Sequence, residues 1–260
     1  MVLRTTDWPV APAAGAAKGK TSPKRRNGAA AQAKKLGNLP EWKLGDLYEA
    51  PDAGTLKADL AQSEQAADAM HARYAGKLAA LLDGGKGGAE LARAVREFEH
   101  LNDVLGRIVS YAGLLYAADT SDPKWQKFYG DIQEKITAIS SKLLFFGLEL
   151  NRLDDAALEA AMANSELGHF LPWIEDLRKE KPYQLDDKLE QLFHEKAVTA
   201  RGAWDRLFNE TMTSLRFSVD GEKLSLEPTL NRLLDQDGTK RRRASEALAK
   251  VFKENLRLFT

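Results

Sequence analysis

The sequence predicts a mainly α-helical fold, built from long antiparallel helices, with one small β-hairpin near residues 215–226. Apolar residues recur at steps of three and four from about residue 52 onward, which is the spacing of one helix face. The breaks between these stretches are short, so consecutive helices should pack antiparallel. There is no cysteine and no apolar run long enough to cross a membrane, so we expect neither disulfides nor a membrane span.

Three long helices are expected in the first half of the chain. The first covers about residues 52–82 and ends at a glycine-rich run, 84–88. The second runs from about residue 89 to residue 118, where Thr120-Ser121-Asp122-Pro123 indicates a stop and a restart. The third follows from Pro123 to about residue 150. The glycine-rich run lacks the Lys-Ser/Thr pair of a phosphate-binding loop, so we assign it no ligand.

Shorter helices are expected between residues 154 and 215. Asp154 or Asp155 begins the first, and Ser165 begins a second that Pro172 kinks. Two more cover about residues 186–200 and the stretch that follows it. The apolar side chains that we expect these last two helices to bury are Leu189, Leu192, Phe193, Ala197, Trp204, Leu207, Phe208, Met212 and Leu215.

The pattern changes after residue 214. Residues 215–219 alternate apolar and polar side chains, and Asp220-Gly221 separates them from a second short segment, 224–226, which predicts a β-hairpin. A short helix should follow to about residue 234, and Asp237 should cap the last helix. That helix shows no stop signal before Thr260, so we expect further protein to follow.

The first 38 residues differ from the rest in charge. They hold eight lysines and arginines against one acid, a net charge of +7, and therefore leave −7 for the remainder. This Ala/Gly/Lys-rich tail has almost no large side chains after Trp8, and we expect it to be disordered. A plain solvated extension is our interpretation. An organelle transit peptide and a nucleic-acid-binding arm are the alternatives.

None of the four histidines has a second histidine one helical turn later. The residue at i+4 is Ala75 for His71, Val104 for His100, Trp173 for His169 and Val198 for His194. His194-Glu195 therefore begins a zinc-protease motif that Val198 does not complete. We predict no catalytic, cofactor-binding or metal-binding residue in this chain, and rim positions for the histidines.

Two other charged groups have structural interpretations. The pairs Asp154-Asp155 and Asp186-Asp187 lie at expected helix starts, where a carboxylate accepts hydrogen bonds from free backbone N–H groups. The basic run 240–243 is interpreted as a solvated helix face with Glu246 and Glu254 as partners, with an anion-binding patch as the alternative.

From Leu39 to Thr260 the chain resembles the N-terminal half of oligoendopeptidase F, a thimet-oligopeptidase-like zinc metallopeptidase. The runs that carry this resemblance are LPEWKLGDLY (39–48), SYAGLLYAADTSDP (110–123), AISSKLLFFGLELNRLDDAAL (138–158), EKAVTARGAWDRLFNETMTSLRFSVDGEKLSLE (195–227) and RRRASEALAKVFKENLRLF (241–259).

The resemblance implies an N-terminal helical domain, 39–200, and the start of a peptidase domain, 201–260, that stops before the catalytic half. It implies one zinc ion, bound downstream of Thr260, and oligopeptide substrates that enter a channel walled by these helices. A cytoplasmic location follows, with neither nucleic acid nor membrane as a partner; the chain alone should be inactive. The alternatives are a non-catalytic helical interaction module and a basic-tailed nucleic-acid or membrane-surface binder.

Overall fold

The computed structural model describes residues 42–83 and 86–260. The predicted disordered tail, 1–38, lies outside these residues. By contact the described residues fall into two compact units: Leu44–Leu114 with Lys127–Gly202, and Leu115–Gln126 with Ala203–Thr260. The predicted domain boundary at residues 200/201 stays a prediction. No helix among the described residues is long and apolar enough to span a membrane.

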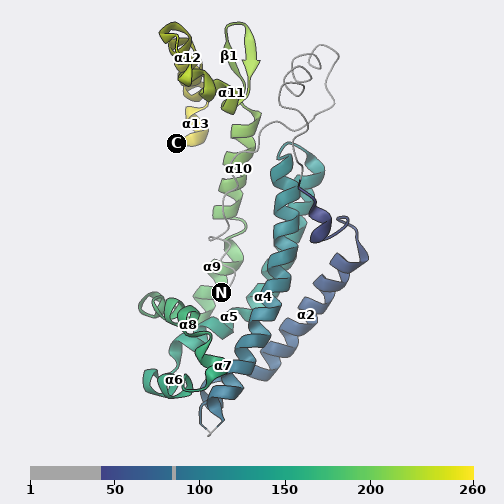
Figure 1. The fold of residues 1–260 in the computed structure, drawn as a ribbon, viewed down its shortest axis with the longest axis vertical. Coiled ribbons are helices and arrows are strands. Elements are labelled where there is room, and N and C mark those ends of the chain that lie inside the picture. Colours follow the sequence, from purple (N-terminus) through teal and green to yellow (C-terminus); the bar gives the residue numbers. More distant parts are fainter. Residues whose placement is uncertain (1–41, 84–85) are drawn as a thin grey trace. The chain divides into compact units, whose positions relative to one another are not determined.

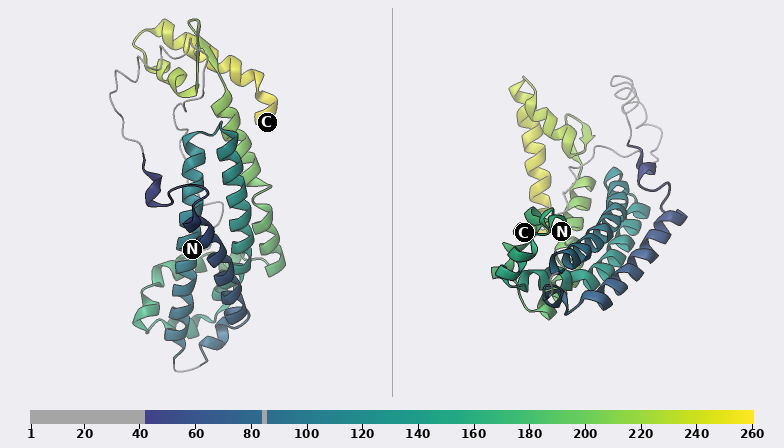
Figure 2. Two further views of the ribbon diagram at one scale, coloured as in Figure 1. Left: turned by 90° about the vertical axis from the view of Figure 1, so that its right-hand side faces the viewer. Right: turned by 60° about the horizontal axis from the view of Figure 1, so that its bottom comes forward.

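Long helices form the first unit, as the sequence predicts. A 3₁₀ turn, η1 (Leu44–Asp46), precedes α2 (Gly54–Tyr74), and most of α4 (Gly87–Ala118) and α5 (Pro123–Arg152) belongs to this unit. The three α-helices lie side by side (Figures 1 and 2). Their apolar stripes meet in a core where the rings of Phe98 and Phe146 stack 4.6 Å apart.

The prediction of one helix over 52–82 is wrong. After α2 the chain turns at Gly76, whose φ is +74°, and resumes as α3 (Leu78–Leu81). A positive φ interrupts a right-handed helix and suits glycine because it has no Cβ. The Glu149 carboxylate stabilises the turn by accepting hydrogen bonds from the backbone N–H of Gly76 (2.5 Å) and of Leu78 (3.3 Å).

A series of short helices follows α5. Their bounds are α6 (Asp155–Ala161), α7 (Ser165–Gly168), α8 (Leu171–Arg178), η2 (Lys181–Tyr183), α9 (Asp187–Lys196) and α10 (Arg201–Ser214). The prediction of one helix from Ser165, kinked at Pro172, is wrong. The structure has two helices there, α7 and α8, and Pro172 lies in the first turn of α8, where its missing N–H costs nothing.

The predicted burial on α9 and α10 is wrong for most of the large side chains. Leu189 and Leu192 are 41% and 47% exposed and Phe193 is 62% exposed. Trp204 and Phe208 on α10 are exposed as well. Periodicity identifies an apolar face, but it does not show that another part of the described chain covers that face.

The predicted hairpin is confirmed. Strand β1 (Phe217–Val219) pairs antiparallel with β2 (Glu222–Leu224), and Phe217 stands opposite Leu224. Asp220 and Gly221 between the strands have φ values of 51° and 81°, the two positive angles that a type I′ turn requires.

Around this hairpin the second unit builds its own core. Phe217 is fully buried with Leu215 and Leu248, and its ring meets Phe252 edge-on at 5.6 Å. The other elements are α11 (Leu226–Asn231), η3 (Arg232–Leu234), α12 (Gly238–Glu254) and α13 (Leu256–Phe259). Asp237 caps α12 as predicted, but the last helix breaks at Asn255, which is non-helical.

Candidate functional site

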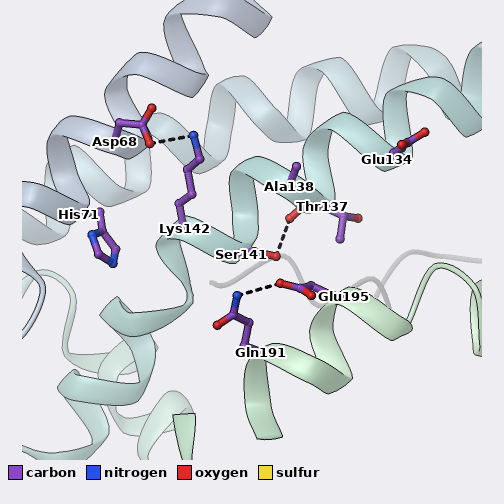
Figure 3. A pocket seen from close by; sticks show the side chains of 9 residues that line it. All are labelled: Asp68, His71, Glu134, Thr137, Ala138, Ser141, Lys142, Gln191 and Glu195. Atoms are coloured by element: carbon purple, nitrogen blue, oxygen red, sulfur yellow. Dashed lines mark hydrogen bonds and ion pairs between the residues drawn. The ribbon is translucent and has the colours of Figure 1, made fainter. Parts of the chain in front are cut away.

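A polar hollow of about 570 Å³ lies in the first unit, between α2, α5 and α9 (Figure 3). This size falls in the range of small-ligand sites. Its lining is hydrophilic apart from one alanine, which distinguishes it from the surrounding core. The lining residues are Asp68, His71, Glu134, Thr137, Ala138, Ser141, Lys142, Gln191 and Glu195.

Helix α5 supplies one continuous side of the hollow. Glu134, Thr137, Ala138, Ser141 and Lys142 are spaced by three, one, three and one residues, which places them on a single face of a helix. The opposite face of α5 carries its apolar stripe and packs into the core. The Ser141 hydroxyl donates to the Thr137 carbonyl at 2.9 Å, so its lone pairs remain available to a ligand.

Lys142 links α5 to α2. Its ammonium lies 2.7 Å from the carboxylate of Asp68 and 3.6 Å from that of Glu64. The hydrogen bond to Asp68 is the main cause that raises the pKa of Lys142. Lys142 therefore stays a cation, and Asp68 is neutralised within the hollow.

The remaining two carboxylates of the hollow have no cationic partner among the residues that the structure describes. Glu195 on α9 accepts a hydrogen bond from the neutral amide of Gln191 at 2.8 Å. Glu134 makes no ion pair with any residue that the structure describes. The hollow therefore presents an excess of hydrogen-bond acceptors and negative charge, a lining suited to groups that donate N–H bonds.

The histidines divide into exposed and half-buried positions. His71, His100 and His169 are exposed, as predicted, but His194 on α9 is half-buried. Burial lowers the pKa of His194; a hydrogen bond to the backbone of Thr137 and the charge of Glu195 oppose this shift. The Nε2 atom of His194 is buried and finds no hydrogen-bond partner among the described residues. Burial thus favours the neutral form of the His194 imidazole.

The described residues do not fit the zinc ion that the resemblance implies. Nowhere in 42–83 and 86–260 do three His, Asp or Glu side chains gather as a metal would need. Val198, at the position of the missing second histidine, lies in the turn after α9. The placement of zinc downstream of Thr260 stays a prediction.

The carboxylate pairs have the structural roles that the sequence predicts. The side chains of Asp154 and Asp186 cap α6 and α9 by accepting from backbone N–H groups. Asp155 pairs with Arg178 and Lys181, and Asp187 pairs with Arg152.

The predicted partners of the basic run are wrong. Lys240 pairs with Asp235, Arg243 pairs with Asp220, and Arg241 donates to the carbonyls that precede α12. The run therefore contacts the hairpin turn and the loop before α12, which fold back on the first turns of the helix.

Comparisons with known proteins support the resemblance seen in the sequence. Residues 149–217 match the model of the family described as Oligopeptidase F. Among solved structures, oligoendopeptidase-F from Enterococcus faecium matches over 84% of this chain, with a TM-score of 0.62 and 19% identity. The chain spans 40% of that protein's length. No curated protein matches the sequence.

The resemblance to oligoendopeptidase F is thereby confirmed, and so is the mainly helical fold with one small hairpin. The family match covers the end of α5, all of α6 to α10 and the first residue of β1. It therefore includes α9, which contributes Gln191 and Glu195 to the polar hollow.

Proposed function

We propose that this chain is the N-terminal, substrate-channel-forming part of a zinc-dependent metalloendopeptidase that hydrolyses internal bonds of short oligopeptides. The observation that carries the proposal is the family match over residues 149–217, in a chain whose fold follows that of an oligoendopeptidase-F. In this proposal the enzyme works in the cytoplasm, and residues 201–260 begin its peptidase domain.

The side chains of this segment indicate which steps of the proposed reaction it can contribute to. Zinc would activate a water molecule for attack on the peptide carbonyl, and its ligands would come from outside the residues described above. This segment holds no converging ligand set among its described residues, so its contribution is to bind and orient the peptide.

The polar hollow is the surface that we assign to peptide contact. An extended peptide exposes backbone N–H and C=O groups that need partners once water is removed. The carboxylates of Glu134 and Glu195 and the hydroxyl of Ser141 accept hydrogen bonds, and the Gln191 amide both donates and accepts. The hollow can therefore satisfy a peptide backbone without recognising one particular sequence.

Two measurements test this proposal. The purified chain should not cleave a quenched fluorescent peptide with or without added zinc, and cleavage that a chelator abolishes would contradict it. A short peptide carrying a photoreactive group should crosslink to α5 and α9 at the hollow. Crosslinking should fall in a Glu134→Gln, Glu195→Gln double variant and persist in the Glu99→Gln control, which alters an exposed glutamate on α4. Crosslinks scattered evenly over the chain would rule out the hollow as the contact surface.

A further inference from the structure

Charge is unevenly distributed in the polar hollow of the first unit. Among the described residues, its lining holds the carboxylates of Asp68, Glu134 and Glu195 but one ammonium, that of Lys142. Lys142 also lies 3.6 Å from Glu64, so two carboxylates on α2 share this cation. The lining is therefore negatively charged, and Glu134 and Glu195 carry the excess.

These two carboxylates come from different walls of the hollow. Glu134 lies on α5 and Glu195 lies on α9 (Figure 3). Neither pairs with a cation in the part of the chain that the structure describes, and Glu195 accepts a hydrogen bond from the neutral Gln191 amide at 2.8 Å. A group that enters the hollow therefore meets unpaired negative charge on two walls.

Thr137 is independent evidence that the hollow lacks a hydrogen-bonding partner. It lies on α5 between Glu134 and Ser141, lines the hollow and is 8% exposed. Its hydroxyl makes no hydrogen bond with any residue that the structure describes. Buried hydroxyl groups nearly always have a partner. The N–H group of a bound ligand would supply one, because a hydroxyl oxygen accepts through its lone pairs.

The spread of the carboxylates favours a basic side chain over a compact metal ion. Within residues 42–83 and 86–260, no three His, Asp or Glu side chains converge as metal ligands would. A lysine or arginine side chain has a long flexible stem and several N–H donors, so it can bond to acceptors that stand apart. Arginine can also bind one carboxylate through two parallel hydrogen bonds.

We propose that the hollow selects peptides that carry a lysine or arginine side chain, and that Glu134 and Glu195 determine this preference. All three walls belong to the first unit, so the lining does not depend on the elements at the end of the chain. The inference rests on the proposed peptide contact and adds a charge preference to it. The preference is for a kind of side chain and not for one sequence.

The expected preference is modest and depends on salt. Glu134 and Glu195 are exposed, so water weakens their attraction for a cation. At low ionic strength we expect an arginine peptide to bind about five-fold more tightly than its norleucine counterpart. The two affinities should approach each other at about 1 M salt, where the screening length is about 3 Å.

Peptide binding to the full chain, measured by fluorescence anisotropy, tests the proposal. The probes are short peptides with an acetylated amino terminus, an amidated carboxyl terminus and a neutral fluorophore, and they differ at one central position: arginine, lysine, norleucine or glutamate. Because the termini are uncharged, a preference reports on the side chain alone. We expect the arginine and lysine peptides to bind most tightly and the glutamate peptide least.

Two variants should change the preference in opposite directions. In Glu134→Gln, Glu195→Gln the ratio of the arginine to the norleucine affinity should fall to about one, while the Glu99→Gln control on α4 keeps the parent ratio. Lys142→Met removes the cation beside Asp68 and should raise the ratio several-fold. A merely structural role for these side chains would not produce such an increase. Thermal unfolding verifies that each variant is folded.

Failure of this inference is distinguishable from failure of the proposed function. Equal affinities for the arginine and norleucine peptides in the parent chain would overturn the charge preference, while crosslinking of both at the hollow would uphold the peptide contact. A preference for arginine that survives in Glu134→Gln, Glu195→Gln would also overturn it, because the cation would then bind elsewhere. If none of the peptides binds, the peptide contact and the preference are both wrong.

Discussion

At the scale of single residues, burial distinguishes His194 from the other histidines. His194 lies on α9 and hydrogen-bonds the backbone of Thr137 on α5, while Nε2 stays unpartnered among the described residues. Desolvation disfavours the charged imidazolium, so the pKa of His194 lies below that of an exposed histidine. We therefore expect the contact between α5 and α9 at His194 to be sensitive to pH.

This shift has a definite sign. A lowered pKa means that the unfolded chain takes up a proton before the folded chain does. His194 therefore costs no stability above the ordinary histidine pKa. As the pH falls from there through the folded pKa of His194, the free energy of unfolding decreases, so the folded state becomes less stable relative to the unfolded state. We expect His194→Gln to reduce the loss of stability between pH 7 and pH 5, measured by urea unfolding. In the His100→Gln control, which alters an exposed histidine, the full loss should remain. Identical pH profiles for His194→Gln and the parent chain would contradict this assignment.

Arg178 is a second residue whose position decides its role. Its guanidinium is largely covered and donates to the carbonyls of Leu150 (3.0 Å) and Leu153 (3.1 Å) and to the carboxylate of Asp155. The Leu150 carbonyl lies in the last turn of α5 and also accepts a long hydrogen bond from the backbone N–H of Leu153 (3.4 Å), whereas the Leu153 carbonyl lies just after the helix. Arg178 thus joins α8 to the C-terminus of α5.

We expect Arg178→Met to destabilise the first unit by about 2 kcal/mol, because it leaves two carbonyl groups short of hydrogen bonds. The adjacent Lys179→Met removes a charge at a mostly exposed side chain and should change the free energy of unfolding by less than about 0.5 kcal/mol. Denaturant unfolding of both variants provides the test. A cost for Arg178→Met no greater than that of the control would show that the carbonyls are satisfied by water.

At the scale of elements, the hairpin depends on the backbone of its turn. Gly221 has a φ of +81°, and a Cβ added there would meet no neighbouring atom. Gly221→Ala should therefore cost about 1 kcal/mol through backbone strain alone. Gly106 also has open space around it but lies inside α4, so Gly106→Ala should stabilise the protein by up to about 1 kcal/mol. Opposite signs in thermal unfolding are expected, and a neutral Gly221→Ala would contradict the strain argument.

The elements also show where sequence reasoning succeeds and fails. The long helices α4 and α5 and the hairpin were predictable, because their signals are local: apolar periodicity, a Pro restart and an Asp-Gly turn. The break at Gly76 was not, because it is stabilised by Glu149, 73 residues away in the sequence. The exposure of Leu189 and Phe193 was missed for a similar reason, since periodicity does not specify what covers a helix face.

The polar hollow also depends on contacts between parts of the chain that are far apart in the sequence. Its lining comes from α2, α5 and α9, and no short motif connects Asp68, Glu134 and Glu195. The one available signal is the set of polar residues at helical spacing on α5, which resembles an ordinary solvated face. Only the packing of the three helices turns that face into a hollow, so the candidate site required the structure.

At the scale of the whole molecule, the two units have separate cores. Phe217 is fully buried in the second unit, and Phe146 is fully buried in the first. Because the side chains that pack with Phe217 belong to the second unit and the Phe98 ring that stacks on Phe146 belongs to the first, damage to one core should leave the hydrogen bonds of the other protected from exchange. This independence gives the last prediction.

Phe217→Ala should lower the stability of the second unit by about 3–5 kcal/mol, the cost of removing a buried phenylalanine. Hydrogen–deuterium exchange read by mass spectrometry should then show faster exchange over residues 115–126 and 203–260, with the rest of the helices of the first unit unchanged. Phe146→Ala is the reciprocal variant and should accelerate exchange over 44–83, 86–114 and 127–202 instead. Uniformly faster exchange along the whole chain in either variant would mean that the two cores unfold as one cooperative structure.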